Sequence, residues 1–175
     1  MELRLKGLSA LWIAIAIGGL ARAHASELAK EGIARATIVV PDAATPVERS
    51  AAEELRLHLD QVTGARFVVT NESAAASGPR ILVGNTAALR TLLPGFDPKS
   101  VAYDGVVLKT VGENLILAGH PQRGALYAVY TYLEDTVGVR WWTSSETFIP
   151  RVPPLPLRAV AGPHAQRYPA ALSGD

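Results

Sequence analysis

Apolar and polar residues alternate over residues 106–117, on either side of a short loop formed by Gly112, Glu113 and Asn114. A period of two across a glycine-containing loop of this length is typical of a β-hairpin. The period then lengthens to three and four residues, which predicts an amphipathic helix that Gly138 ends as a C-terminal cap. The predicted apolar face of this helix consists of Leu126, Val129, Tyr130, Leu133 and Val137. A short strand ending on two tryptophans follows, so residues 103–142 combine a sheet with a covering helix.

A second helix is predicted from its end signals. Thr45 and Glu48 have the spacing of a capping box, in which each side chain binds the other residue's backbone amide. Pro46 suits the first helical position, and Gly64 closes the helix. The predicted buried stripe consists of Val47, Ala51, Leu55, Leu59 and Val62.

Short aliphatic runs at residues 36–40, 67–69 and 81–83 predict three further strands, and residues 86–92 predict a weaker helix. The pattern changes after Trp142, because half of the twelve prolines lie at or beyond Pro150. This composition predicts that residues 151–175 form an extended proline-rich linker or tail outside the core.

The N-terminus has the organisation of a signal peptide. Arg4 and Lys6 precede an apolar run at residues 8–20, and residues 23–25 (AHA) form a small-x-small cleavage site. The apolar run is shorter than the ~20 residues that a spanning helix needs. We therefore expect cleavage near Ala25, export to the periplasm or the extracellular space, and no stable membrane anchor; an uncleaved anchor is the alternative.

Composition excludes several classes of function. The 175 residues are about half apolar, which suits one domain with a substantial core. The formal charge of +1 leaves no basic surplus for nucleic acid, and without residues 1–25 the charge becomes −1. The absence of cysteine excludes thiol nucleophiles, iron–sulfur clusters and cysteine-rich zinc sites.

Residues 119–124 (GHPQRG) lie between a predicted strand and a predicted helix, which is the setting of a phosphate-binding loop. Such a loop continues with Lys and Ser or Thr, but Ala125 and Leu126 follow here. A helix N-terminus beside Arg123 still offers a place for an anion or a sugar carboxylate. The simpler interpretation, which we favour, is a strand-to-helix turn that needs glycine backbones.

Hydrolysis of a glycoside usually needs two carboxylates that face each other across a cleft, ~5 to ~9.5 Å apart. The candidates are the pairs at residues 53–54 and 134–135 in predicted helices, and Asp104 and Glu146 in predicted loops. Neighbours on a helix point about 100° apart, so neither helical pair flanks one bond. The four histidines are scattered, and no zinc or serine hydrolase motif occurs. We therefore predict no catalytic residue, no metal site and no cofactor in this chain.

Arg140, Trp141 and Trp142 form the most suggestive cluster. Adjacent residues of a strand point to opposite faces, so at most one of the two tryptophans is expected to fill the core. The other would meet solvent, a sugar ring or another domain, since aromatic faces stack on sugars and arginine binds carboxylates. We favour packing at a domain interface over sugar binding.

Several short motifs together carry a resemblance to a known family. They are, in order, residues 51–55 (AAEEL), 63–65 (TGA), 81–84 (ILVG), 123–130 (RGALYAVY) and 138–141 (GVRW). In this order and spacing, roughly residues 36–150 resemble the N-terminal domain of α-glucuronidases of glycoside hydrolase family 67. They are similar, more loosely, to the domain that precedes the barrel in β-N-acetylhexosaminidases.

The resemblance implies an α/β (α+β) sandwich, in which a mixed β-sheet has two main helices packed on one face. In those families a catalytic (β/α)8 barrel follows and supplies the acid and base. We therefore expect residues 26–150 to be a non-catalytic accessory domain of an exported carbohydrate-active enzyme whose barrel partner is missing from this chain. One alternative is a free-standing carbohydrate- or surface-binding module that uses a tryptophan platform. The other, a complete enzyme, is the weakest because the chain lacks a carboxylate pair.

Overall fold

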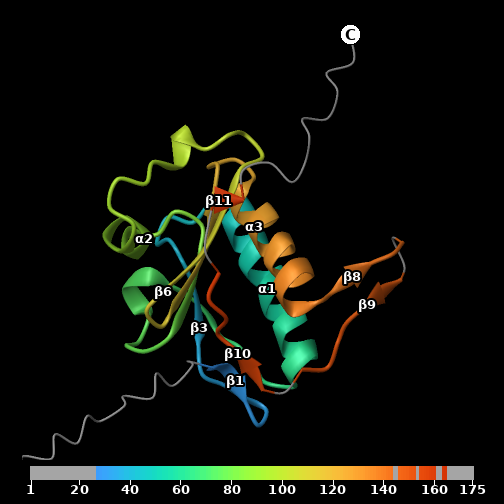
Figure 1. Cartoon of the computed structure of the whole chain (residues 1–175). Coiled ribbons are helices and arrows are strands. Elements are labelled where there is room, and N and C mark those ends of the chain that lie inside the picture. Colours follow the sequence, from blue (N-terminus) through green and yellow to red (C-terminus); the bar gives the residue numbers. More distant parts are fainter. Residues whose placement is uncertain (1–26, 144–145, 153, 161–162, 165–175) are drawn as a thin grey trace, which may run out of the picture.

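A computed structural model describes residues 27–143, 146–152, 154–160 and 163–164. Figure 1 shows a twisted sheet with helices on both sides. The predicted signal peptide and its cleavage site lie outside the described residues. Among the described residues, no helix has the length and apolar character needed to cross a membrane.

The central sheet has six strands in the order β11-β6-β7-β5-β3-β4. Their bounds are β3 Thr37–Val40, β4 Val69–Asn71, β5 Arg80–Val83, β6 Val106–Val111, β7 Asn114–Gly119 and β11 Pro163–His164. Strands β4, β3, β5 and β7 run parallel, whereas β6 is antiparallel to β7 and β11 is antiparallel to β6. The predicted hairpin is β6–β7, whose turn begins at Gly112 with a φ of 57°, a conformation that favours glycine.

Two main helices cover one face of the sheet, as the resemblance implied. They are α1 (Pro46–Thr63) and α3 (Gly124–Tyr132), and α3 continues into a π-helical turn, η3 (Leu133–Val137). The short helix α2 (Ala87–Leu92) lies on the opposite side (Figure 1). Two single 3₁₀ turns, η1 (Glu72–Ala74) and η2 (Pro98–Ser100), lie in the connections. The fold is thus an α/β sandwich built on a mixed sheet.

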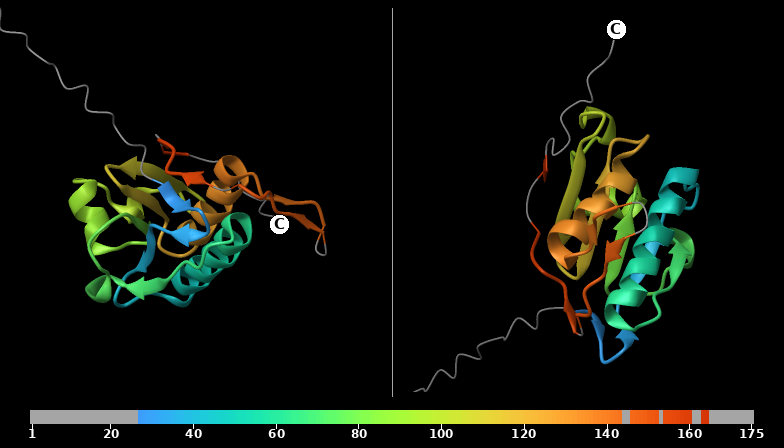
Figure 2. Two further views of the ribbon diagram at one scale, coloured as in Figure 1. Left: turned by 90° about the horizontal axis from the view of Figure 1, so that it is seen from below. Right: turned by 90° about the vertical axis from the view of Figure 1, so that its right-hand side faces the viewer.

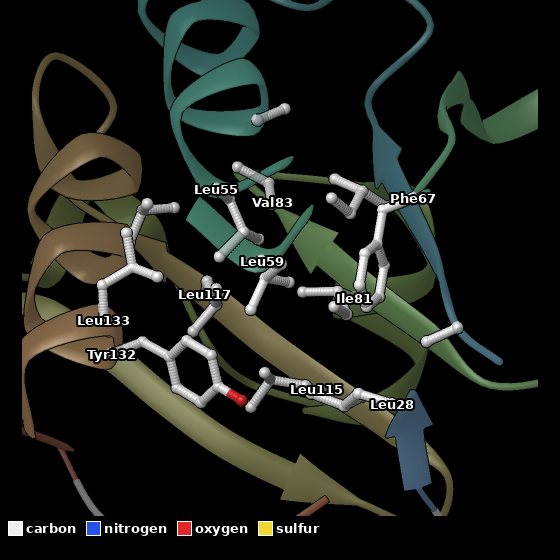
Figure 3. Close-up of a cluster of buried hydrophobic side chains, with 14 of the residues drawn as sticks. Leu28, Leu55, Leu59, Phe67, Ile81, Val83, Leu115, Leu117, Tyr132 and Leu133 are labelled. Atoms are coloured by element: carbon white, nitrogen blue, oxygen red, sulfur yellow. The ribbon is translucent and has the colours of Figure 1, made fainter. Parts of the chain in front are cut away.

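The parallel strands are buried on both faces, because each face has its own apolar cover. Ile38, Ile81 and Leu115 belong to the larger core beneath α1 and α3 (Figure 3). The residues that follow them, Val39, Leu82 and Ile116, belong to a smaller core beneath α2. Alternate residues therefore enter different cores, which explains why these strands read as continuous aliphatic runs.

The predicted capping box of α1 is confirmed. The backbone amide of Glu48 donates to Thr45 Oγ1 at 3.2 Å, and the amide of Thr45 donates to Glu48 Oε2 at 2.8 Å. Gly64 ends the helix with a φ of 71°, and its amide donates to the Asp60 carbonyl oxygen at 2.9 Å. Both ends of α1 are therefore satisfied by residues within or next to the helix.

The buried face of α3 differs from the predicted one. Tyr132 is fully buried in the larger core (Figure 3). Leu126 and Tyr130 are only half-buried. Leu126 still packs against the larger core, so the prediction is wrong for Tyr130, whose ring meets Trp141. The small residues Ala125 and Ala128 face inward on this side of α3. Burial in apolar surroundings raises the pKa of the Tyr132 hydroxyl.

The proline-rich segment was expected to lie outside the core, and for residues 154–160, here called the C-terminal strap, this expectation is wrong. Leu155 and Leu157 are buried in the larger core. The strap contributes β10 (Leu155–Pro156), which pairs with β1 (Glu27–Lys30), and β1 pairs in turn with β2 (Ile33–Ala34). Prolines suit this position because the strap lies at the edge of a small three-stranded sheet, where few backbone amides must donate.

Candidate functional site

The two tryptophans lie on a separate two-stranded ribbon, not on the central sheet. The aromatic ribbon consists of β8 (Arg140–Trp141), Trp142 and β9 (Thr147–Phe148). Its strands are antiparallel, with Arg140 opposite Phe148 and Trp141 opposite Thr147. Figures 1 and 2 show that it projects beyond the end of α3. Gly138, with a φ of 94°, makes the turn that directs the chain from η3 into the ribbon.

Neither tryptophan fills the core, which agrees with the expectation that at most one would do so. Trp141 is 36% exposed and its ring meets the rings of Tyr130 and His58 edge to face, at 5.3 and 5.6 Å between centroids. Trp142 is 69% exposed and stacks on Phe148 at 6.0 Å with an interplanar angle of 16°. Trp141 therefore ties the ribbon to α1 and α3, while Trp142 and Phe148 present an apolar surface to solvent.

Arg140 has a structural role in this arrangement. Its guanidinium donates to the backbone carbonyl oxygens of Glu134 and Val139, the latter at 2.8 Å. Carbonyl groups at the end of a helix lack partners within the helix, and a cationic side chain satisfies them well. These bonds hold the guanidinium against the end of η3.

Arg123 lies at the opposite end of the α3–η3 helix from the aromatic ribbon, roughly 20 Å away at 1.5 Å per residue. Its guanidinium lies over the ring of Tyr103, 5.4 Å from the centroid, and donates to the Tyr127 hydroxyl at 3.4 Å. The bond to Tyr127 raises the pKa of Arg123. The four predicted site residues therefore do not form one site.

The glycines of the GHPQRG loop are needed for packing. A Cβ atom at Gly119 would lie 2.3 Å from the carbonyl oxygen of Gly105 and 2.9 Å from Cα of Gly124. A Cβ at Gly124 would lie 2.3 Å from the backbone of Gly119. The strand end and the helix start thus touch through their backbones, which supports the interpretation of this loop as a tight strand-to-helix turn.

Many of the acidic side chains bind elements of the fold. Glu53 and Asp60 both pair with Arg56 along α1, at 2.8 and 3.1 Å. Glu72 accepts from the first backbone amides of α2, including that of Ala87 at 2.7 Å. Among the described residues, no group of three or more His, Cys, Asp or Glu side chains is arranged to hold a metal ion.

A crevice lies where four parallel strands end, and the sequence patterns did not indicate it. Its lining includes Asp42 after β3, Glu72 after β4, Asn85 after β5 and Pro121 after β7. Its volume is about 440 Å³. Finding it requires the strand order: β4 and β5 lie on opposite sides of β3, so the loops after β3 and β5 diverge and leave a gap.

Comparisons with known proteins agree on one family. The family described as "Glycosyl hydrolase family 67 N-terminus" matches residues 20–132. The chain is also similar to the "Probable alpha-glucuronidase A" of Aspergillus terreus (strain NIH 2624 / FGSC A1156), with 32% identity over 90 residues. The aligned residues make up 51% of this chain and 11% of that relative. The chain therefore matches a small part of a much longer protein.

Proposed function

Because the chain belongs to the family of glycosyl hydrolase family 67 N-terminal domains, we propose that it is a non-catalytic accessory domain of an exported, α-glucuronidase-like enzyme. The observation that carries this proposal is the family match over residues 20–132. The similarity to a probable α-glucuronidase supports the same class of enzyme. The proposed substrate is a plant-type or other polysaccharide.

The side chains of the described domain support the non-catalytic role. Glycoside hydrolysis depends on two carboxyl groups that reach one glycosidic bond. The carboxylates of Glu48 and Glu72 accept from backbone amides at the starts of α1 and α2, and that of Glu53 pairs with Arg56, so these groups have structural partners. In our proposal the acid and base belong to a (β/α)8 barrel encoded beyond this domain. Residues 1–25 then act as a signal peptide that directs the enzyme out of the cytoplasm.

The aromatic ribbon is the part of the surface that we assign to contact with that barrel. Trp142 and Phe148 form an exposed stacked pair, and large exposed apolar groups mark interaction sites. The ring of Trp141 packs on Tyr130 and the guanidinium of Arg140 binds the Val139 carbonyl oxygen, so these two residues fix the ribbon to the rest of the domain. Arg123 remains a candidate for a second contact at the opposite end of α3.

A direct test is catalysis by the purified chain from Ser26 onward. We expect it to release no sugar from aryl glycosides or from glucuronoxylan. Turnover that disappears when Glu134 or Glu146 is changed to Gln would contradict the proposal. Reading the DNA downstream of the codon for Asp175 provides an independent test, because an in-frame barrel is expected there.

A free-standing carbohydrate-binding module is the second candidate, because the ring of Trp142 is 69% exposed and aromatic faces stack on sugars. Binding of the purified domain to insoluble xylan distinguishes the two. If Trp142→Ser abolishes such binding in a soluble, monomeric domain, the module interpretation replaces the accessory-domain proposal.

A further inference from the structure

The crevice at the carboxyl ends of the parallel strands has the position and size of a small-molecule site. In open α/β sheets, ligands bind outside the carboxyl ends of the strands, at the point where the strand order reverses. That point here lies between β3 and β5, and the crevice opens directly above it. A volume of about 440 Å³ lies within the usual range for sites that hold one small ligand.

The frame of the crevice is rigid because buried or capping carboxylates tie its loops together. Glu48 is 5% exposed and accepts from the amide of Asn85 at 2.9 Å as well as from Thr45, so it joins the loops after β3 and β5. A Cβ atom at Gly84 would lie 2.3 Å from Glu48 Oε1, so this close approach requires glycine. Such a frame exists before any ligand arrives, which lowers the entropic cost of binding.

The lining leaves two charged groups facing solvent with capacity for further hydrogen bonds. Asp42 is exposed and accepts from the Ser73 amide at 2.9 Å through Oδ1, and the side chain of Ser73 is a second partner of the carboxylate. A carboxylate has about four lone-pair sites, so it can still accept from a ligand. Arg90 is exposed, and Nη1 donates to the Asn85 carbonyl oxygen at 3.3 Å. By contrast, both oxygens of Glu48 and of Glu72 accept bonds from the protein.

We infer that this crevice binds a neutral saccharide unit, with Asp42 accepting from ligand hydroxyls and Arg90 donating to them. A hydroxyl group both donates and accepts, so neighbouring sugar hydroxyls match a carboxylate and a guanidinium that line the same cavity. Three carboxylates against one guanidinium disfavour an anionic ligand such as a uronate. Pro41, Ala43, Ala87 and Pro121 supply small apolar walls for the ring carbons. The choice of a sugar over another neutral polar molecule rests on the proposed function.

Backbone amide NMR of the purified chain from Ser26 onward tests this inference with xylose, xylotriose and glucuronate as probes. We expect saturable, millimolar shifts of the Ala43, Asn85 and Ala87 amides with the neutral sugars and weaker shifts with glucuronate. Arg90→Ala removes an exposed group with one long hydrogen bond, so it is expected to keep the fold and to weaken binding about tenfold. Arg66→Ala, an exposed change beyond the other end of α1, is the matched control.

The inference is overturned if no amide near the crevice shifts in a saturable way, if the shifts instead cluster around Trp142, or if Arg90→Ala binds as tightly as the unmodified chain. Stronger binding of glucuronate than of xylose would overturn the assignment of a neutral ligand. None of these results bears on catalysis or on a downstream barrel. The crevice inference can therefore fail while the accessory-domain proposal stands.

Discussion

The packing of the C-terminal strap predicts a large effect from one substitution in a segment whose composition suggests a linker. Leu155 is 4% exposed, lies in the larger core and belongs to the strand that pairs with β1. Leu155→Ala removes about three carbon groups at ~0.8 kcal/mol each, which is roughly 2.4 kcal/mol of transfer free energy. A residual cavity adds to this cost, and buried Leu→Ala changes span ~2 to ~5 kcal/mol. Since the strap lies at the periphery and can partly collapse, we expect about 2 to 3 kcal/mol.

Leu57→Ala is the matched control because it is the same chemical change at an exposed position. Leu57 is 43% exposed on α1, and alanine has the higher helix propensity, so we expect a cost below ~1 kcal/mol. Urea unfolding measures both variants. With a slope of ~2 kcal/mol per molar urea, Leu155→Ala lowers the midpoint by roughly 1 M and leaves the slope unchanged.

If residues 154–160 were instead a linker outside the core, the same experiment would give a different result. In that case Leu155→Ala would leave the unfolding midpoint where it is, because an exposed linker residue contributes little to the free energy of unfolding. If Leu155→Ala costs no more than Leu57→Ala, the strap is not part of the folded domain and our description of the core is wrong.

Three further predictions concern α1, α3 and the aromatic ribbon. Thr45→Ala removes the cap of α1 and should lower the free energy of unfolding by about 1 kcal/mol. Leu133→Ala opens a cavity in the larger core and should lower it by ~2 to ~5 kcal/mol. If chemical denaturation gives the reverse order, the residues assigned to the core are wrong. Tyr132→Phe should raise the free energy of unfolding by about 1 kcal/mol, because the buried hydroxyl has no hydrogen-bond partner among the described residues, and a loss of stability would reveal one. Trp142→Ser should improve solubility without lowering the thermal midpoint, whereas Trp141→Ser should lower it through the lost ring contacts; a loss of several kcal/mol from Trp142→Ser would mean that its ring is core.

Local signals in the sequence were sufficient to predict the elements whose energies are themselves local. The capping box at Thr45 and Glu48 satisfies amides within one helical turn, so its residues specify the start of α1 without any tertiary contact. The same holds for the turn of the β6–β7 hairpin and for Gly138, whose left-handed conformation ends η3. Short motifs in a consistent order were likewise enough to identify the family.

The predicted buried stripe of α1 is confirmed at Ala51, Leu55, Leu59 and Val62, but only the tertiary structure decided the exact buried face of α3 and the burial of the strap. Periodicity placed an apolar face on α3, but the position of that face depends on how closely α1 and the sheet approach, so Tyr132 is inside and Tyr130 is not. Proline content indicated an extended chain after Pro150, but an extended chain can cross solvent or a core. Leu155 is buried because β1, more than a hundred residues earlier in the sequence, offers it a strand to pair with. The crevice depends on strand order for the same reason: contacts between distant segments are a property of the folded chain and leave no local pattern.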